Sequence, residues 1–339
     1  MKNKLAYFVT KSSMFGVGFF LLCNLNNKNT YISIILGTLL GLAIIYLYKL
    51  LKKYTINNNL QKTLKSTSIG KIFNILLFIF YIYLLCITIL IITTFINSFY
   101  LIKTPKIVII LPLLLISLYL NFKESIVLSN LSNLAFYFSL FIVIIFSLLL
   151  IPYGKIDELY PFLNYDNLNI IKGSIIYASI SSIPLILVNN YDTDIKNTYK
   201  NYLIGSLVNL SIVIGTTLAL GNNLLNVYRF PEYAVIKQIK IFDFIENIEN
   251  MSAFGWYAES FIVISLIIYN IKLSIPPKHN KLFLTSITSM VTIISIILFG
   301  NNYDLLLKLF YIHPYILISY IIIFIIMLCY LKVKKNTNN

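Results

Sequence analysis

Residues 5–23 read LAYFVTKSSMFGVGFFLLC, an apolar run long enough to cross a bilayer, with small residues at its centre. A transmembrane helix needs about 20 predominantly apolar residues. Two serines, Ser12 and Ser13, and two glycines, Gly16 and Gly18, occupy the middle of this run. Glycine in a helix interior costs about 1 kcal/mol relative to alanine. The run therefore predicts a membrane-spanning helix that is interrupted near the bilayer centre.

The rest of the chain has the composition of a membrane protein. Of its 339 residues, 58% are hydrophobic and only 12% are charged, and a soluble domain carries about 25% charged residues. A net charge of +15 would suggest a nucleic-acid partner in a soluble protein. Here the lysines lie between apolar runs, where membrane topology explains them, so we exclude nucleic-acid binding.

Apolar runs of spanning length recur along the chain and are separated by polar clusters. No soluble domain is long enough to fold separately, so residues 1–339 are predicted to form a single all-α polytopic transmembrane domain with ten helices. The predicted spans are residues 5–23, 30–50, 72–101, 105–121, 125–152, 170–190, 202–221, 251–271, 282–300 and 305–331.

The lysines predict the orientation of these spans. With the N-terminus inside, most of the 27 basic residues fall in inner loops and most of the 12 acidic residues fall on the outer side. Loops on the cytoplasmic side of a membrane carry an excess of Lys and Arg. Both termini are therefore predicted to be cytoplasmic.

Ten spans divide into two sets of five with opposite orientation, as in transporters built from inverted repeats. The first repeat is residues 1–152. The second is residues 153–339 and contains a long outer loop at residues 222–250, in which Val235 and Ile236 lie on one face of a predicted amphipathic helix. Such a helix should lie on the outer surface or fold into it.

In such repeats the first helix of each set is interrupted, so span six should resemble span one. Residues 178–185 read ASISSIPL. Pro184 removes one helical hydrogen bond, and the three serines beside it offer replacements. The two interruptions occupy corresponding positions, which favours a ligand site between them; helix packing through small residues is the alternative.

Glu259 lies near the middle of span eight, where an acidic residue costs about 2.5 to 3.5 kcal/mol on insertion scales. Lys11 is a plausible partner, and the two side chains fit a structural ion pair, a site for a ligand ammonium group or a proton-responsive group. Trp256 is interpreted as a packing residue, and His313, which precedes Pro314, as the neighbour of a helix kink in preference to a proton relay. The predicted ligand-binding residues are Ser13, Phe15, Gly16, Gly18, Ser179, Ser181, Ser182 and Glu259.

No sequence motif points to catalysis. The chain has no Walker loop, no HExxH motif and no Ser-His-Asp arrangement. Its three cysteines, Cys23, Cys86 and Cys329, are far apart and have no companion histidine for a metal site. We therefore predict neither an enzyme nor a bound metal or cofactor.

Residues 228–269 carry a resemblance to a known family. They read YRFPEYAVIKQIKIFDFIENIENMSAFGWYAESFIVISLIIY. The Phe-Pro-Glu-Tyr start at residues 230–233, the Ile-x-Asp-Phe-Ile-Glu-x-Ile-Glu element at residues 241–249 and Trp256 resemble the spore germination permease family, the B-type subunits of germinant receptors. Residues 159–162, Leu-Tyr-Pro-Phe, are similar to that family's segment before span six.

The resemblance implies the LeuT-like inverted-repeat fold of the amino acid–polyamine–organocation superfamily. It also implies A-type and C-type partner subunits in the spore inner membrane and a nutrient ligand such as an amino acid. The sequence departs from the family at Gly16-Val17-Gly18, at Ser182-Ile183-Pro184 and at Leu128, where a basic residue is usual. A secondary amino-acid transporter coupled to protons or sodium is the alternative, and a scaffold without a ligand is a third possibility.

Overall fold

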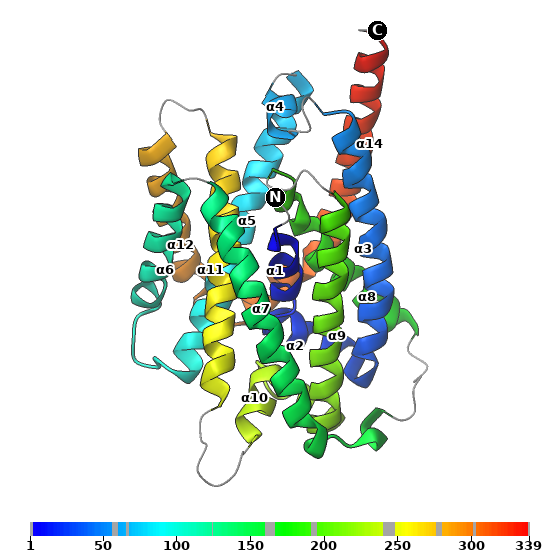
Figure 1. The fold of residues 1–339 in the computed structure, drawn as a ribbon, viewed down its shortest axis with the longest axis vertical. Helices are drawn as coiled ribbons and strands as arrows, with labels where there is room; N and C mark the ends of the chain where they lie inside the picture. Colours follow the sequence, from blue (N-terminus) through cyan, green and yellow to red (C-terminus); the bar gives the residue numbers. More distant parts are fainter. Residues whose placement is uncertain are drawn as a thin grey trace.

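A computed structural model describes residues 3–55, 60–65, 68–123, 125–159, 167–190, 195–239, 248–275, 280–300 and 303–337. Within these ranges the secondary structure is entirely helical. The helices run mainly along the long axis of one bundle (Figure 1). They are α1 (Leu5–Ser12), α2 (Val17–Asn26), η1 (Asn27–Asn29), α3 (Thr30–Lys53), α4 (Leu60–Lys65), α5 (Ser68–Phe99), α6 (Lys106–Phe122), α7 (Ser125–Leu150), η3 (Ile151–Tyr153), η4 (Ile156–Leu159), α8 (Asn167–Ser182), η5 (Ile183–Asn190), α9 (Ile195–Leu225), α10 (Pro231–Gln238), α11 (Glu249–Ser274), α12 (Asn280–Phe299), α13 (Tyr303–Tyr311) and α14 (His313–Thr337).

Eight segments of the described chain are long and apolar enough to cross a membrane. The prediction of an all-helical membrane protein is thereby confirmed. The described residues contain eight candidate spans, whereas ten were predicted. The difference has two causes. The first predicted span is divided into α1 and α2, neither of which is long enough alone, and α6 has only 17 residues. The eight segments are residues 17–53, 69–99, 126–153, 167–188, 195–225, 249–274, 281–298 and 306–333.

The predicted interruption of the first span is present between α1 and α2. The helix stops at Ser12, and Gly16 has φ +57° and ψ −92°. This left-handed region is readily available only to glycine. A Cβ atom on Gly18 would collide with the carbonyl oxygen of Ser13. Both glycines are therefore required by the shape of the interruption.

The second predicted interruption is a change of helix type. α8 ends at Ser182, and the chain continues as the 3-10 helix η5, whose second residue is Pro184. Proline cannot donate the next helical hydrogen bond, which explains why the α-helix ends there. The hydroxyl of Ser182 donates to the carbonyl oxygen of Ala178 at 2.6 Å.

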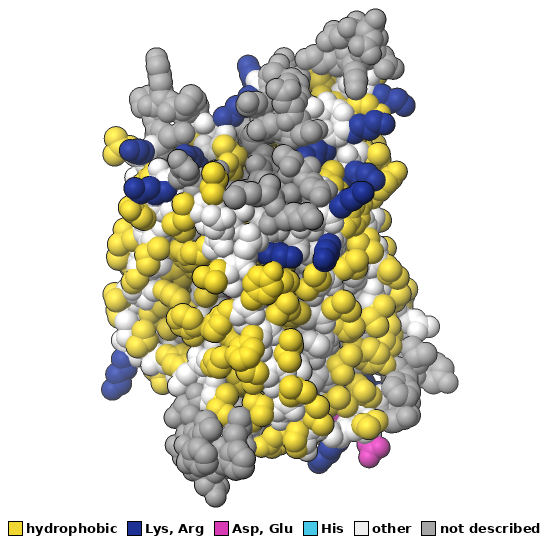
Figure 2. All heavy atoms as spheres, in the orientation of Figure 1, with side chains coloured by type: hydrophobic (Ala, Val, Ile, Leu, Met, Phe, Trp, Pro, Cys, Tyr) yellow, Lys and Arg dark blue, Asp and Glu magenta, His cyan; other side chains and the backbone are white. Residues whose placement is uncertain are grey.

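α1 lies at the centre of the bundle (Figure 1). It contacts α7, α8, α9 and α11, and every residue from Leu5 to Lys11 is buried. The face shown in Figure 2 is apolar along most of its length, and lysines gather toward the end where the C-terminus lies. This distribution is the one that an apolar solvent around the middle of the bundle requires.

The segment at residues 222–250, which is predicted to be an outer loop, folds into the bundle. Its described helix, α10, contacts α9 and α11, and Glu232, Tyr233, Val235 and Ile236 are all buried. Of the two placements predicted for this amphipathic segment, the structure shows insertion between helices. Residues 240–247 lie outside the described part.

α3 and α8 pack with their backbones close together. A Cβ atom on Gly37 of α3 would lie 2.6 Å from the carbonyl oxygen of Ser174 in α8. A backbone oxygen cannot move away without displacing its helix, so only glycine fits at this position.

We predict that Gly37→Ala lowers the free energy of unfolding by about 1 to 3 kcal/mol, the usual cost of an overpacked core. Gly215→Ala is the control, because its Cβ atom would meet only the Leu150 side chain at 3.4 Å. Thermal unfolding of both variants in detergent measures the difference. Equal melting temperatures for the two variants would contradict the close packing of α3 and α8.

Candidate functional site

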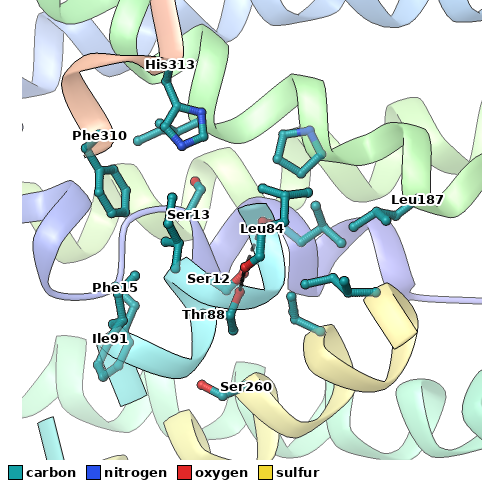
Figure 3. Close-up of a pocket in the computed structure, with 16 residues that line it drawn as sticks. Ser12, Ser13, Phe15, Leu84, Thr88, Ile91, Leu187, Ser260, Phe310 and His313 are labelled. Atoms are coloured by element: carbon teal, nitrogen blue, oxygen red, sulfur yellow. Dashed lines mark hydrogen bonds between the residues drawn. The ribbon is translucent and has the colours of Figure 1, made fainter. Parts of the chain in front are cut away.

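Three cavities border residues of α1 or of the segment that follows it, and the largest of the three, of about 70 Å³, lies beside the interruption between α1 and α2. Its walls come from α1, α5, α8, η5, α11, α13 and the first residue of α14. Two predicted site residues, Ser13 and Phe15, line it, and so does Pro184 of the second interruption. In Figure 3, His313 and Ser260 lie at opposite ends of the cavity, with Ser12 and Ser13 between them.

None of the residues that line this cavity is charged. Three of its hydroxyl groups donate to carbonyl oxygens of their own helices: Ser12 to Val9 at 3.2 Å, Ser13 to Thr10 at 2.6 Å, and Thr88 to Leu84 at 2.8 Å. Because their protons are engaged, these oxygens can only accept further hydrogen bonds. The cavity therefore suits a small, largely apolar molecule that carries hydrogen-bond donors.

His313 is the only nitrogen-bearing side chain among the described residues of the cavity wall. It is 2% exposed and packs against the rings of Tyr83 and Phe310, and its Nδ1 atom has no hydrogen-bond partner in the described chain. A buried polar atom without a partner is rare in native proteins. The interpretation as the neighbour of a helix kink is therefore incomplete, because His313 also offers a polar atom to the cavity.

Lys11 and Glu259 form the predicted ion pair. Each is 6% exposed. The Ser139 hydroxyl links them, because its oxygen accepts from Lys11 Nζ at 2.8 Å and its proton is donated to Glu259 Oε1 at 2.8 Å. Tyr7 OH lies 2.8 Å from the same Ser139 oxygen. The cluster joins α1, α7 and α11, and Ser139 and Tyr7 were not identified from the sequence.

The structure does not bring Glu259 to the largest cavity. The ion pair instead lines two smaller cavities, of about 50 Å³ and 30 Å³, together with Glu232 and Trp256. Phe15 lines both the largest cavity and the 30 Å³ cavity, so its ring forms the partition between them. Of the roles left open for Lys11 and Glu259, the geometry shows an ion pair between helices.

The start of α2 binds a carboxylate of the chain itself. The backbone N–H of Gly16 donates to Glu232 Oε1 at 2.6 Å, and the Phe230 ring fills the space that a Cβ atom on Gly16 would need. Glu232 is 5% exposed, and its other oxygen, Oε2, has no described partner. Burial raises the pKa of Glu232 from 4.5 to about 7, although hydrogen bonds from two backbone N–H groups oppose the rise.

The three predicted serines of α8 lie away from the cavities. All are fully buried, and each hydroxyl donates to a carbonyl oxygen of its own helix: Ser179 to Ile176 at 2.7 Å, Ser181 to Tyr177 at 2.7 Å and Ser182 to Ala178 at 2.6 Å. None of the three lines a described cavity. Their surroundings fit the packing alternative.

Trp256 belongs to an aromatic cluster beside the interruption, as its interpretation as a packing residue predicts. Its ring centroid lies 4.7 Å from that of Phe15 and 5.1 Å from that of Phe95. Phe230 and Tyr233 of α10 lie 5.3 Å and 5.2 Å from Phe95. Edge-to-face ring contacts of this kind stabilise a cluster beyond its buried area.

We predict that Lys11→Met and Glu259→Gln each destabilise the protein by about 3 kcal/mol, because each leaves a buried charge without its partner. The double variant should lose less than the sum of the two. Thermal unfolding in detergent measures this coupling, with Lys308→Met at an exposed position as the control. Additive effects of the two substitutions would show that the pair contributes no coupling energy.

The free energy of unfolding should depend on pH through the protonation of Glu232. The native state keeps the Glu232 proton up to about pH 7, whereas an exposed carboxyl releases it near 4.5. The free energy of unfolding should therefore fall as pH rises from about 4.5 through 7, by on the order of 3 kcal/mol. Melting curves of wild type and Glu232→Gln across this range test it, because only the wild type should show this loss. Parallel curves would contradict the shifted pKa.

A comparison with protein families matches residues 2–305 of the chain to the family described as spore germination protein. No curated protein matches the chain. The matched region includes both interruptions, α10 and all residues of the Lys11–Glu259 cluster. The resemblance found in residues 228–269 is thereby confirmed, and the chain belongs to the spore germination protein family of permease-like membrane proteins.

Proposed function

We propose that this chain is the permease-like subunit of a spore germinant receptor, which senses a small nutrient such as an amino acid and triggers germination. The observation that carries the proposal is the uncharged cavity between the end of α1 and the start of η5. Interrupted helices place backbone groups and small side chains against a ligand at mid-membrane depth. The cavity is also lined by α5, α8, α11, α13 and the first residue of α14, so a bound molecule would lie among seven elements.

The proposal includes ten spans in two inverted sets of five. In this arrangement α1 and α2 together form span one, α6 forms span four, and α8 with η5 forms span six. Two features support it. The interruptions fall in the first member of each set, and both border the same cavity. The lysines at the end that holds the C-terminus support cytoplasmic termini (Figure 2).

A nutrient in this cavity would make few contacts with charged groups and many contacts with apolar side chains. Hydroxyl oxygens of Ser12, Ser13 and Thr88 would accept hydrogen bonds from its donors, and His313 would contact its far end. Such a ligand changes the protein only if it binds two conformations with different affinities. In the proposed receptor, the conformation favoured by the nutrient is recognised by A-type and C-type subunits in the spore inner membrane.

The alternative is a secondary active amino-acid transporter coupled to protons or sodium. The observation in its favour is the Lys11–Glu259 pair, because ionisable residues inside a membrane often mark ion or proton pathways. The same cavity would serve a sensor and a transporter. Flux of the ligand across the membrane distinguishes them.

We predict saturable binding of a labelled amino acid to the purified protein in liposomes, without concentrative uptake. Ser260→Phe should abolish binding, since its ring would fill one end of the cavity. Ser286→Phe, at an exposed position on α12, is the matched control. Gly16→Trp is a poor test, because the Phe230 ring already occupies the space beside Gly16.

Three results would change this conclusion. Concentrative uptake that is lost in Ser260→Phe would favour the transporter. Binding that is equal in Ser260→Phe and Ser286→Phe would place the ligand elsewhere. Absence of binding by any amino acid in the presence of partner subunits would exclude this ligand class and favour a scaffold.

A further inference from the structure

The contact between Glu232 and Gly16 joins two parts of the molecule that are far apart in the sequence. Gly16 is the residue directly before α2, a helix of 10 residues that starts at the interruption. Glu232 lies in the first turn of α10 in the outer loop. The first N–H groups of a helix have no partner within it, and the helix dipole places partial positive charge there. This end of α2 therefore attracts a carboxylate.

The Glu232 carboxylate uses only part of its hydrogen-bonding capacity. One oxygen accepts from Gly16 at 2.6 Å, and the other is buried without a described partner. The charged groups that line the same cavities are Lys11 and Glu259, which are bonded to each other. Lys11 is thus paired with Glu259 and not with Glu232, and the start of α2 supplies the hydrogen bond to the Glu232 carboxylate.

The contact between Glu232 and Gly16 also holds α10 against the interruption between α1 and α2. Phe230 occupies the space next to Gly16, and Tyr233 packs against Phe99 with 4.4 Å between ring centroids. The hydroxyl groups of Tyr233 and Tyr100 share a hydrogen bond at 2.9 Å. α10 therefore closes one end of the interruption through two aromatic rings and one carboxylate.

We propose that Glu232 is a tethered internal carboxylate that occupies the anion-binding start of α2, and that a carboxylate-bearing ligand must displace it and thereby release α10. This inference rests on the proposed function for the identity of the ligand as a nutrient with a carboxylate. It extends that function, because it identifies the segment through which occupancy of the site would be transmitted.

Glu232 and a free carboxylate should compete for the start of α2, for two physical reasons. Two carboxylates at one site repel each other, so both cannot remain ionised there. A free carboxylate gains the same hydrogen bond from Gly16 that Glu232 gives up. Coupling between the two events is reciprocal: whatever loosens α10 raises the affinity of the site for a free carboxylate by the same factor.

Accessibility of Met14 tests the tether without any knowledge of the nutrient. Met14 is buried and lines the 30 Å³ cavity beside Glu232. In a protein with Cys23→Ala, Cys86→Ser and Cys329→Ser, Met14→Cys would be modified by a membrane-impermeant methanethiosulfonate reagent added on the α10 side. At pH 8, where Glu232 is ionised, adding Glu232→Ala should raise the modification rate by about tenfold or more, the factor for loss of a charge-assisted hydrogen bond. Glu232→Gln, which keeps an acceptor but no charge, should give an intermediate rate.

Glu158→Gln is the matched control. Glu158 Oε2 accepts from the N–H of Asn222, next to Gly221 with φ +71°, so it repeats the same local chemistry away from the cavities. This substitution should leave the rate unchanged. Equal rates in Glu232→Ala and Glu158→Gln would overturn the tether.

Sodium acetate supplies the competing carboxylate, with sodium chloride at equal ionic strength as its control. Acetate in large excess should raise the rate in the protein with Glu232 and leave Glu232→Ala unchanged. A rate insensitive to acetate in both would overturn the exchange. Neither result depends on amino-acid binding, so failure of the nutrient assignment and failure of this inference are distinguishable.

Discussion

A helix that stops inside a bilayer leaves backbone N–H and C=O groups that need hydrogen-bond partners, which lipid cannot supply. The rest of this molecule is arranged to supply them. In the gap between α1 and α2, Met14 and Gly16 are buried and Ser13 and Phe15 are half-buried. Side-chain hydroxyls of Ser12 and Ser13 bond to carbonyl oxygens of the preceding turn, and the N–H of Gly16 finds a carboxylate on α10. The outer loop therefore completes the interrupted helix, which explains why α10 is buried among helices.

The same requirement applies to charge. Lys11 lies one residue before the end of α1 and would be unstable there alone. Its bonds to Ser139 and Glu259 fix the end of α1 against two other helices at the level of the interruption. α1 is thus held at its broken end by ionic contacts on one side, while its other side borders an uncharged cavity. This separation allows one interruption to serve both stability and ligand binding.

The sequence was sufficient for those features that depend on local chemistry. Apolar runs located the helices, glycine and proline located both interruptions, and the need to pair an intramembrane acid linked Glu259 to Lys11. Apart from the Lys11–Glu259 pair, contacts between distant segments were not predictable. The start of a helix favours a carboxylate, yet nothing local in residues 228–239 indicates that Glu232 would reach the start of α2. His313 resembled any histidine before a proline, and the serines of α8 gave no sign that their hydroxyls would bond to their own helix.

The glycines of α3 have a mechanical consequence. Because Gly37 brings the backbones of α3 and α8 together, these two helices cannot slide past each other without a steric clash, and they should translate as one rigid slab. One wall of the largest cavity is therefore stationary with respect to α3. Any expansion of the cavity must therefore come from movement of its other walls. We expect the mobile part of the molecule to contain α5, α11 and the junction of α13 with α14.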